Sequence, residues 1–189
     1  MRADLTDKAL HSEFRRKVEE LSEQNLSDCY QCGKCSGGCP VEPYVEVSPN
    51  RLIRMVQLGM EAEALSSDSL WHCAGCGTCN GRCPMGIDIM RIKDALRKLT
   101  KDIHFGRGSR SLEAWTFYQS FLDCVRNFGR LSEIGLMGGY NINSGRLLTN
   151  VKKAPWFLLR NKLGVSPHTI KRIDRLQRVF DRIEEIEGK

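Results

Sequence analysis

The sequence lacks any long apolar run. Its longest apolar stretches, such as residues 156–159, span only a few residues, whereas a membrane-spanning helix needs about 20. The N-terminal residues are polar and acidic, without the apolar segment and small-residue cleavage site of a secretion signal. We therefore expect no membrane span, and we expect the chain to stay in the cytoplasm, where thiols remain reduced.

Acidic residues are scarce in the second half of the chain. Residues 1–100 carry 13 Lys and Arg against 14 Asp and Glu, whereas residues 101–189 carry 16 against 9, so the formal net charge of +6 arises in the second half. A basic surface can attract nucleic acid. Because no recognised binding motif accompanies the charge, we expect no nucleic-acid binding.

A recognisable catalytic motif is also missing. The four histidines are scattered along the chain, and no serine–histidine–aspartate or cysteine–histidine arrangement can be argued from their spacing. We predict no catalytic residues in this chain.

Cysteine, by contrast, is abundant. Eight of the nine cysteines fall in two runs with the same spacing, Cys-x2-Cys-x2-Cys-x3-Cys-Pro. This is the spacing with which bacterial ferredoxins bind 4Fe-4S clusters. The first run contains Cys29, Cys32, Cys35 and Cys39, and the second run contains Cys73, Cys76, Cys79 and Cys83.

The spacing also predicts which cysteines share a cluster. Three closely spaced thiolates can wrap one cluster, and in two-cluster ferredoxins the fourth cysteine of each run binds the other cluster. We therefore assign one 4Fe-4S cluster to Cys29, Cys32, Cys35 and Cys83, and a second to Cys73, Cys76, Cys79 and Cys39. Cys35 and Cys39 then belong to different clusters while lying at most about 14 Å apart along the chain, which favours electron relay over catalysis.

Zinc is the main alternative for these cysteines. A structural zinc site closes with four ligands and normally needs only two Cys-x2-Cys pairs, so a triplet plus one cysteine, repeated twice, fits iron–sulfur clusters better. Each oxidised cluster with four thiolates adds about two negative charges. Part of the basic excess can balance them.

The residues around the runs predict helices. The 33 residues between Cys39 and Cys73 include a helix that Ser48 caps and Pro49 begins, and a short helix at 61–65. Asp88 caps another helix with Ile89, Ile92, Leu96 and Leu99 on its apolar face, and Leu10, Phe14, Val18 and Leu21 mark a helix before the first run. The predicted fold is mainly α, with an α-helical ferredoxin domain at residues 1–104.

Residues 105–189 are predicted to form a helical extension. A helix from a cap at Ser109 to Gly129 carries more apolar surface than one stripe, so it is either buried on two sides within this chain or docks a partner. The candidate partner contacts are Trp115, Phe117, Tyr118 and Phe121, whereas Cys124 is expected to be a buried apolar residue.

The rest of the extension is predicted to be a loop and a helix. Residues 137–144 are rich in glycine and asparagine, which is typical of a loop. A last amphipathic helix is expected to begin near Ser166 and Pro167, and it packs on its own domain or forms a partner-binding arm.

The sequence resembles the small iron–sulfur subunit of soluble CoB-CoM heterodisulfide reductases over nearly its whole length. The resemblance rests on residues 29–41 and 71–84, on the Gly-Ile-Asp-Ile at 86–89, and on the Phe-Tyr-x-x-Phe at 117–121 that leads to Gly129-Arg130. It implies an electron-transfer subunit with two 4Fe-4S clusters.

In that family, a flavin-bearing subunit supplies electrons, and a separate disulfide-reducing subunit acts on the CoM-S-S-CoB heterodisulfide of methanogenesis. The assembly couples to a hydrogenase or a formate dehydrogenase. The disulfide-reducing subunit works through motifs that include paired cysteines, and this chain has no Cys-Cys pair. The resemblance therefore implies that this chain is a non-catalytic part of an oxidoreductase complex.

Other electron-transfer proteins remain alternatives. An iron–sulfur subunit of a respiratory dehydrogenase, or of a related sulfur-metabolism reductase, would share the helical ferredoxin module. The succinate type adds a 2Fe-2S domain with four further cysteines, and the glycerophosphate type usually adds a paired-cysteine domain; neither pattern occurs here. A free-standing ferredoxin is disfavoured by the aromatic second half.

Overall fold

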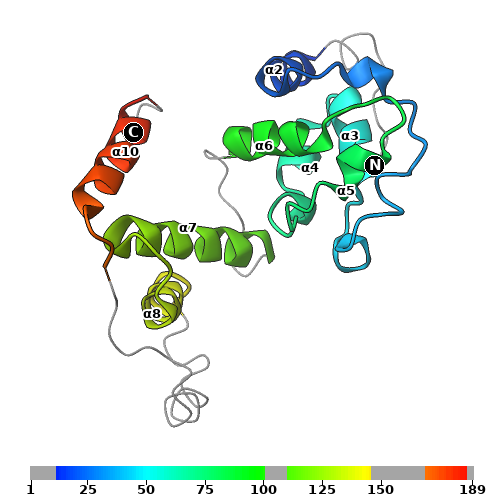
Figure 1. The fold of residues 1–189 in the computed structure, drawn as a ribbon. Helices are drawn as coiled ribbons and strands as arrows, with labels where there is room; N and C mark the ends of the chain where they lie inside the picture. The colour runs from blue at the N-terminus through cyan, green and yellow to red at the C-terminus, as the bar shows by residue number, and fades with distance from the viewer. Residues whose placement is uncertain (1–11, 101–109, 146–168, 187–189) are drawn as a thin grey trace. The chain divides into compact units, whose positions relative to one another are not determined.

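The computed structural model describes residues 12–100, 110–145 and 169–186 (Figure 1). These residues form helices, turns and loops, and no β-strand occurs among them, so the prediction of a mainly α fold is confirmed. The chain divides into two compact units, Met1–Leu112 and Glu113–Lys189. In the described part of the chain, none of the helices has both the length and the apolar character needed to cross a bilayer.

Among its described residues, the first unit contains five complete α-helices and three short 3-10 helices around one core. The α-helices are α2 (Glu13–Ser22), α3 (Pro49–Gln57), α4 (Glu61–Leu65), α5 (Thr78–Arg82) and α6 (Ile89–Leu99), and the 3-10 helices are η1 (Leu26–Asp28), η2 (Glu42–Tyr44) and η3 (Asp68–Leu70). The two cysteine runs are the loops before α3 and around α5 (Figure 1). Apolar side chains of α2, α3 and α6 and the cysteines Cys35 and Cys79 share this core.

Local signals in the sequence explain where these helices begin and end. The Asp88 carboxylate accepts the N–H of Arg91 at 3.1 Å, as the predicted cap should. Pro49 begins α3 directly after Ser48, and Gly59, with a φ of 68°, follows the end of that helix. The predicted helix at 61–65 is α4. The predicted helices and the Asp88 cap are confirmed, whereas Ser48 occupies the N-cap position without a side-chain cap hydrogen bond.

The helix before the first run is shorter than its apolar pattern suggested. Phe14 and Val18 of α2 are buried, but Leu21 is exposed, and Ser22 takes the buried position in the last turn. The Ser22 hydroxyl donates to the Val18 carbonyl at 2.6 Å, so its polar group is satisfied inside the core. Leu21 therefore belongs to the predicted helix but not to its buried face, and Leu10 lies outside the described residues.

The second unit is built around the long helix α7 (Arg110–Phe128), which begins at the end of the first unit, and α8 (Glu133–Asn143). The predicted loop at 137–144 is wrong, because those residues belong to α8 and its C-terminal cap. The Ser132 hydroxyl accepts the N–H of Gly135 at 3.2 Å and caps this helix. A Cβ at Gly135 would lie 3.3 Å from Cys124 Sγ, so glycine lets α8 approach α7 closely. This packing outweighs the low helix propensity of glycine.

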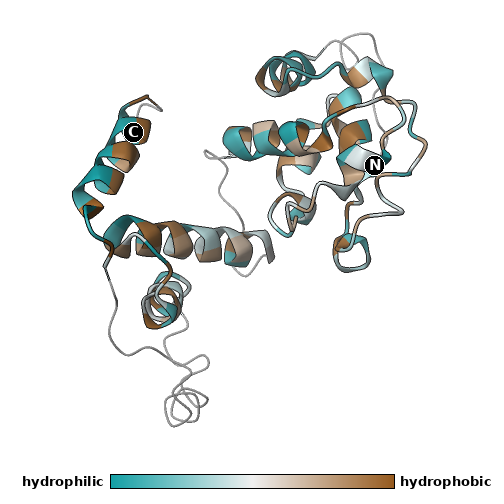
Figure 2. Cartoon of the chain, in the orientation of Figure 1, coloured by the Kyte–Doolittle hydropathy of each residue, from teal (hydrophilic) through white to brown (hydrophobic). Residues whose placement is uncertain are grey.

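The last helix is α10 (Ile173–Ile186). It begins after Arg172, which has a φ of 65°, and the predicted start at Ser166 and Pro167 lies outside the described residues, as does the predicted cap Ser109. Arg126 of α7 binds Asp181 Oδ1 at 2.6 Å and Glu184 Oε1 at 2.7 Å, which ties α10 to α7. The apolar stripe that Figure 2 shows on α10 includes the exposed residues Val179, Ile183 and Ile186.

Candidate metal centres

Two cavities lie between the cysteine runs and the helices that follow them. Cavity 1 is lined by Cys29, Cys32, Cys35 and Cys83, and cavity 2 by Cys39, Cys73, Cys76 and Cys79. Each cavity thus receives three cysteines from one run and the fourth cysteine of the other run. These are the two groups of four that the spacing predicted.

The lining of the cavities suits an inorganic group that is held by thiolates. Among the described residues, neither a carboxylate nor a histidine lines them. Besides its cysteines, cavity 1 is lined by Gln31, Gly33, Asn50, Ile53, Ile87 and Ile89. Cavity 2 is lined by Pro40, Val41, Pro49, Ala74, Met90 and Lys93.

The first turns of α3 and α6 occupy matching places at the two cavities. Asn50 and Ile53 of α3 line cavity 1, and Met90 and Lys93, forty positions later in α6, line cavity 2. The first helical residues are exchanged, since Pro49 lines cavity 2 and Ile89 lines cavity 1. The two halves of the site are therefore related by an approximate twofold repeat. Each cavity also faces a helix N-terminus, whose partial positive charge favours an anionic occupant.

The residue after the third cysteine anchors each run to its helix. The Ser36 hydroxyl accepts the backbone N–H of Asn50 at 3.0 Å, and the Asn80 side-chain oxygen accepts that of Met90 at 3.2 Å. Ser36 and Asn80 occupy equivalent positions in the two runs. Both bonds satisfy a helix N-terminal donor, and they fix the cysteine loop against the helix that lines its own cavity.

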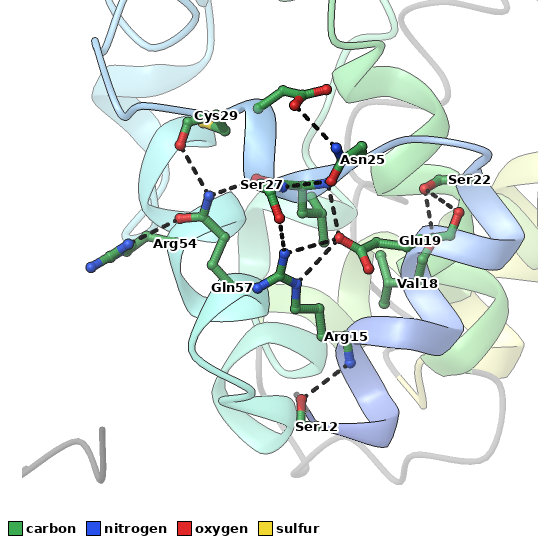
Figure 3. A network of polar contacts seen from close by, with 12 residues as sticks. Ser12, Arg15, Val18, Glu19, Ser22, Asn25, Ser27, Cys29, Arg54 and Gln57 are labelled. Atoms are coloured by element: carbon green, nitrogen blue, oxygen red, sulfur yellow. Dashed lines mark hydrogen bonds and ion pairs between the residues drawn. The ribbon is translucent and has the colours of Figure 1, made fainter. Parts of the chain in front are cut away.

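A buried polar network holds the start of the first run (Figure 3). The Gln57 amide of α3 donates to the carbonyls of Leu26 and Cys29 at 2.7 and 3.0 Å. The Glu19 carboxylate of α2 accepts the N–H of Leu26 at 3.0 Å and pairs with Arg15 at 3.2 Å. Residues from two helices thus position Cys29, and no sequence pattern signals this connection.

The second cysteine of each run is exposed, and the third is buried. Cys32 and Cys76 face solvent, whereas Cys35 and Cys79 belong to the core. Each cavity therefore has one corner that another molecule can approach. Tyr30, 60% exposed, stands at this corner of cavity 1, and Ala74 takes the equivalent position in the second run. The pKa of Tyr30 is raised by desolvation and by the neighbouring thiols of Cys32 and Cys83.

The thiol pKa values follow this difference in exposure. Burial raises the pKa of Cys35 and of Cys79, and for Cys79 the positive charge of Lys93 acts in the opposite direction. The pKa of Cys76 is lowered by the Thr78 hydroxyl, which lies 3.4 Å from the sulfur and can donate to the thiolate. Metal ions bind thiolates rather than thiols, and a lowered pKa favours the thiolate form of Cys76.

Lys93 is a site residue that the sequence reasoning missed. Its side chain is 2% exposed and lines cavity 2, and its ammonium donates to the Ser69 carbonyl at 3.3 Å. None of the described carboxylates forms an ion pair with it. A buried charge normally needs a counter-charge, and an anionic occupant of cavity 2 would supply one. The available signal was a lysine next to Ile89, Ile92 and Leu96 on the apolar face of a helix.

The candidate partner contacts lie on α7. Phe117 and Tyr118 are exposed, whereas Trp115 and Phe121 are half-buried. The buried face of α7 instead presents the small side chains Thr116, Ser120 and Cys124, and α8 packs against Ser120 and Cys124. Cys124 is 4% exposed, which confirms that it is a buried apolar residue. Contact between these aromatic residues and a partner protein stays a prediction.

Comparison with known proteins supports the interpretation of the two cavities. Residues 24–87 match the model of a family described as a 4Fe-4S dicluster domain. This range includes all eight cysteines of the two runs. No curated protein matches the chain. The chain therefore contains a 4Fe-4S dicluster domain, and its cofactors are two 4Fe-4S clusters.

Proposed function

We propose that this chain is a relay subunit that passes electrons between two partner proteins through its two clusters. Cluster 1 is held by Cys29, Cys32, Cys35 and Cys83, and cluster 2 by Cys39, Cys73, Cys76 and Cys79. The observation that carries the proposal is that each cavity is lined by three cysteines of one run and the fourth of the other.

The exchanged cysteines explain how the chain brings two redox centres together. When bound, 4Fe-4S clusters supply reversible one-electron chemistry. Cys35 and Cys39 line different cavities and are four residues apart, so no more than about 14 Å of backbone joins the two sites. The exposed corners at Cys32 and Cys76 give each site its own access from outside. A site with two such entrances suits electron relay between two partners.

We further propose that the complex is a soluble CoB-CoM heterodisulfide reductase. In this assembly the chain would connect the flavin-bearing subunit to the disulfide-reducing subunit, and a hydrogenase or formate dehydrogenase would supply electrons upstream. The support is the resemblance at 29–41, 71–84 and 117–121, together with the absence of paired cysteines from the sequence. The exposed Phe117 and Tyr118 of α7 are the proposed contacts to a partner.

Anaerobic purification of the native complex tests this assignment. We expect two further proteins to co-purify with the chain, one that carries a flavin and one that contains paired cysteines. The purified complex should reduce CoM-S-S-CoB, whereas the isolated chain with about eight irons should not. Co-purification with a respiratory dehydrogenase, or a monomer with no stable partner, would reject the heterodisulfide reductase assignment. Turnover by the isolated chain would reject the relay function itself.

A further inference from the structure

The two cavities differ in one buried charge. Lys93 of α6 lines cavity 2, and the matching position of α3, forty residues earlier, is Ile53, which lines cavity 1. In the part of the chain that the structure describes, no other charged residue lines either cavity. The repeat that makes the two sites alike therefore places a cation beside one of them and an apolar side chain beside the other.

Hydrogen bonds to the cysteine sulfurs do not distinguish the two cavities in this way. The Gln31 amide donates to Cys29 Sγ at 3.4 Å at cavity 1, and the Thr78 hydroxyl lies 3.4 Å from Cys76 Sγ at cavity 2. Each cavity thus has a neutral side-chain donor beside one of its sulfurs. The exposed cations Lys34 and Arg82 lie within the two runs, where water and salt screen their charge.

The hydrogen bonding of Lys93 leaves part of its ammonium available to cavity 2. An ammonium has three donors, and among the described residues only the Ser69 carbonyl accepts one of them. The side chain is almost completely buried, so its charge acts at short range in a medium of low effective dielectric constant.

We propose that Lys93 makes cluster 2 the cluster of higher reduction potential, so that the first electron to enter the protein resides there. The inference rests on the proposed assignment of cysteines to clusters. On one-electron reduction by an external reductant, the negative charge of the site rises from about two to about three and no bond breaks. Lys93 interacts more favourably with the reduced site than with the oxidised one, whereas Ile53 gives cluster 1 no such preference.

Two variants of Lys93 separate its charge from its hydrogen bond. Lys93→Met removes both, and Lys93→Gln removes the charge but retains a donor for the Ser69 carbonyl. Lys34→Met is the matched control, because it removes an exposed positive charge next to Cys35. The full chain, reconstituted anaerobically, is titrated with dithionite and followed by low-temperature EPR, with iron content measured in parallel. Cys76→Ser identifies which titration belongs to cluster 2.

We expect two separate titrations in the native protein, with cluster 2 reduced first. Both Lys93 variants should lower the equilibrium constant for reduction of cluster 2 by about tenfold or more, which corresponds to about 59 mV for one electron. The reduction potential of cluster 1 should stay unchanged. Lys34→Met should change either equilibrium less than about twofold, as expected for a screened charge.

Three results would overturn the inference. One is an unchanged cluster 2 titration in both Lys93 variants with all irons retained. Another is a shift in Lys93→Met but not in Lys93→Gln, which would assign the effect to the hydrogen bond. The third is loss of about four irons from both variants, which would make Lys93 a structural residue. In each case, about eight irons in the native protein would leave the relay function standing.

Discussion

Cys39 and Cys73 line the same cavity, although 33 residues separate them along the chain. Cys39 lies only four residues from Cys35, which lines the other cavity. Cys39 is thus close in sequence to the cysteines of one cavity but lines the other cavity. Its replacement therefore tests directly whether the fourth ligands are exchanged.

Cys39→Ala should release cluster 2 and preserve cluster 1, because it removes a thiolate from cavity 2. Iron content should fall from about eight to about four per chain. Anaerobic alkylation of the folded protein, read by mass spectrometry, should then label Cys73, Cys76 and Cys79. Cys124→Ala, which removes a cysteine outside both runs, should keep all the iron. Labelling of Cys29 and Cys32 in place of the second run would show that the fourth ligands are not exchanged.

Removal of the iron should destabilise the first unit and leave the second unit folded. The core of the first unit includes Cys35 and Cys79, and without clusters it must close over the two cavities that the cysteines line or remain loosely packed. Hydrogen exchange after treatment with a chelator and an oxidant measures this. Amides of α3 and α6 should exchange much faster, and amides in the centres of α7 and α8 should not. Equal acceleration in all four helices would contradict independent units.

Two glycines of α8 should respond in opposite directions to the same substitution. Gly135→Ala places a Cβ about 3.3 Å from Cys124 Sγ and from the Phe128 ring, and such overpacking typically costs about 1–3 kcal/mol. Gly138→Ala meets no atom within 4 Å and should stabilise the helix by up to about 1 kcal/mol. Thermal unfolding measures the stability of both variants. Equal stability would show that α8 does not pack on α7 through Gly135.

In the cluster-free protein, Cys76 should react faster than Cys79. Its pKa is lowered by Thr78, whereas burial raises the pKa of Cys79. A lower pKa gives more thiolate at neutral pH, so iodoacetamide should modify Cys76 faster. Thr78→Val should move the pH profile of Cys76 alkylation to higher pH and leave that of Cys35 in place. An unchanged pH profile of Cys76 alkylation would show that the Thr78 hydroxyl does not lower the pKa of Cys76.

Replacement of the exposed aromatic residues of α7 should break the complex without loss of iron. Phe117→Ser combined with Tyr118→Ser removes apolar area that a partner would bury, while the cavities lie in the other unit. We expect the variant to keep about eight irons and to lose co-purifying subunits. Ile142→Ser, an exposed apolar residue of α8, is the control and should keep them. Retention of the full complex by the double variant would exclude this surface as the contact.

The sequence was most informative where one local pattern determines one structure. Asp88 and Pro49 mark helix starts through their own chemistry, and the cysteine spacing identifies a cofactor that only a few arrangements can bind. The sequence pattern predicts a loop in place of α8, because this helix is stabilised by contact with Cys124 and Ser120 of another helix. Glycine propensity gives no information on such a contact.

The surroundings of the cysteines were harder to predict for the same reason. Gln57 and Glu19 hold the first run through hydrogen bonds to segments 7 to 31 residues away, and no periodicity signals them. Lys93 was visible as a charge on an apolar helix face, but its meaning depends on which cavity that face lines. The last helix begins at Ile173, directly after the turn at Arg172 with its positive φ.

The exposed sulfurs of Cys32 and Cys76 also set the conditions under which the protein can keep its cofactors. Whatever solvent reaches, dioxygen reaches too, and exposed thiolates are the ones most readily oxidised. Each centre is therefore most vulnerable to air at the same corner through which it exchanges electrons. Partners that cover these two corners would protect the clusters while they exchange electrons with them, and the free protein should lose its colour in air faster than the assembled complex.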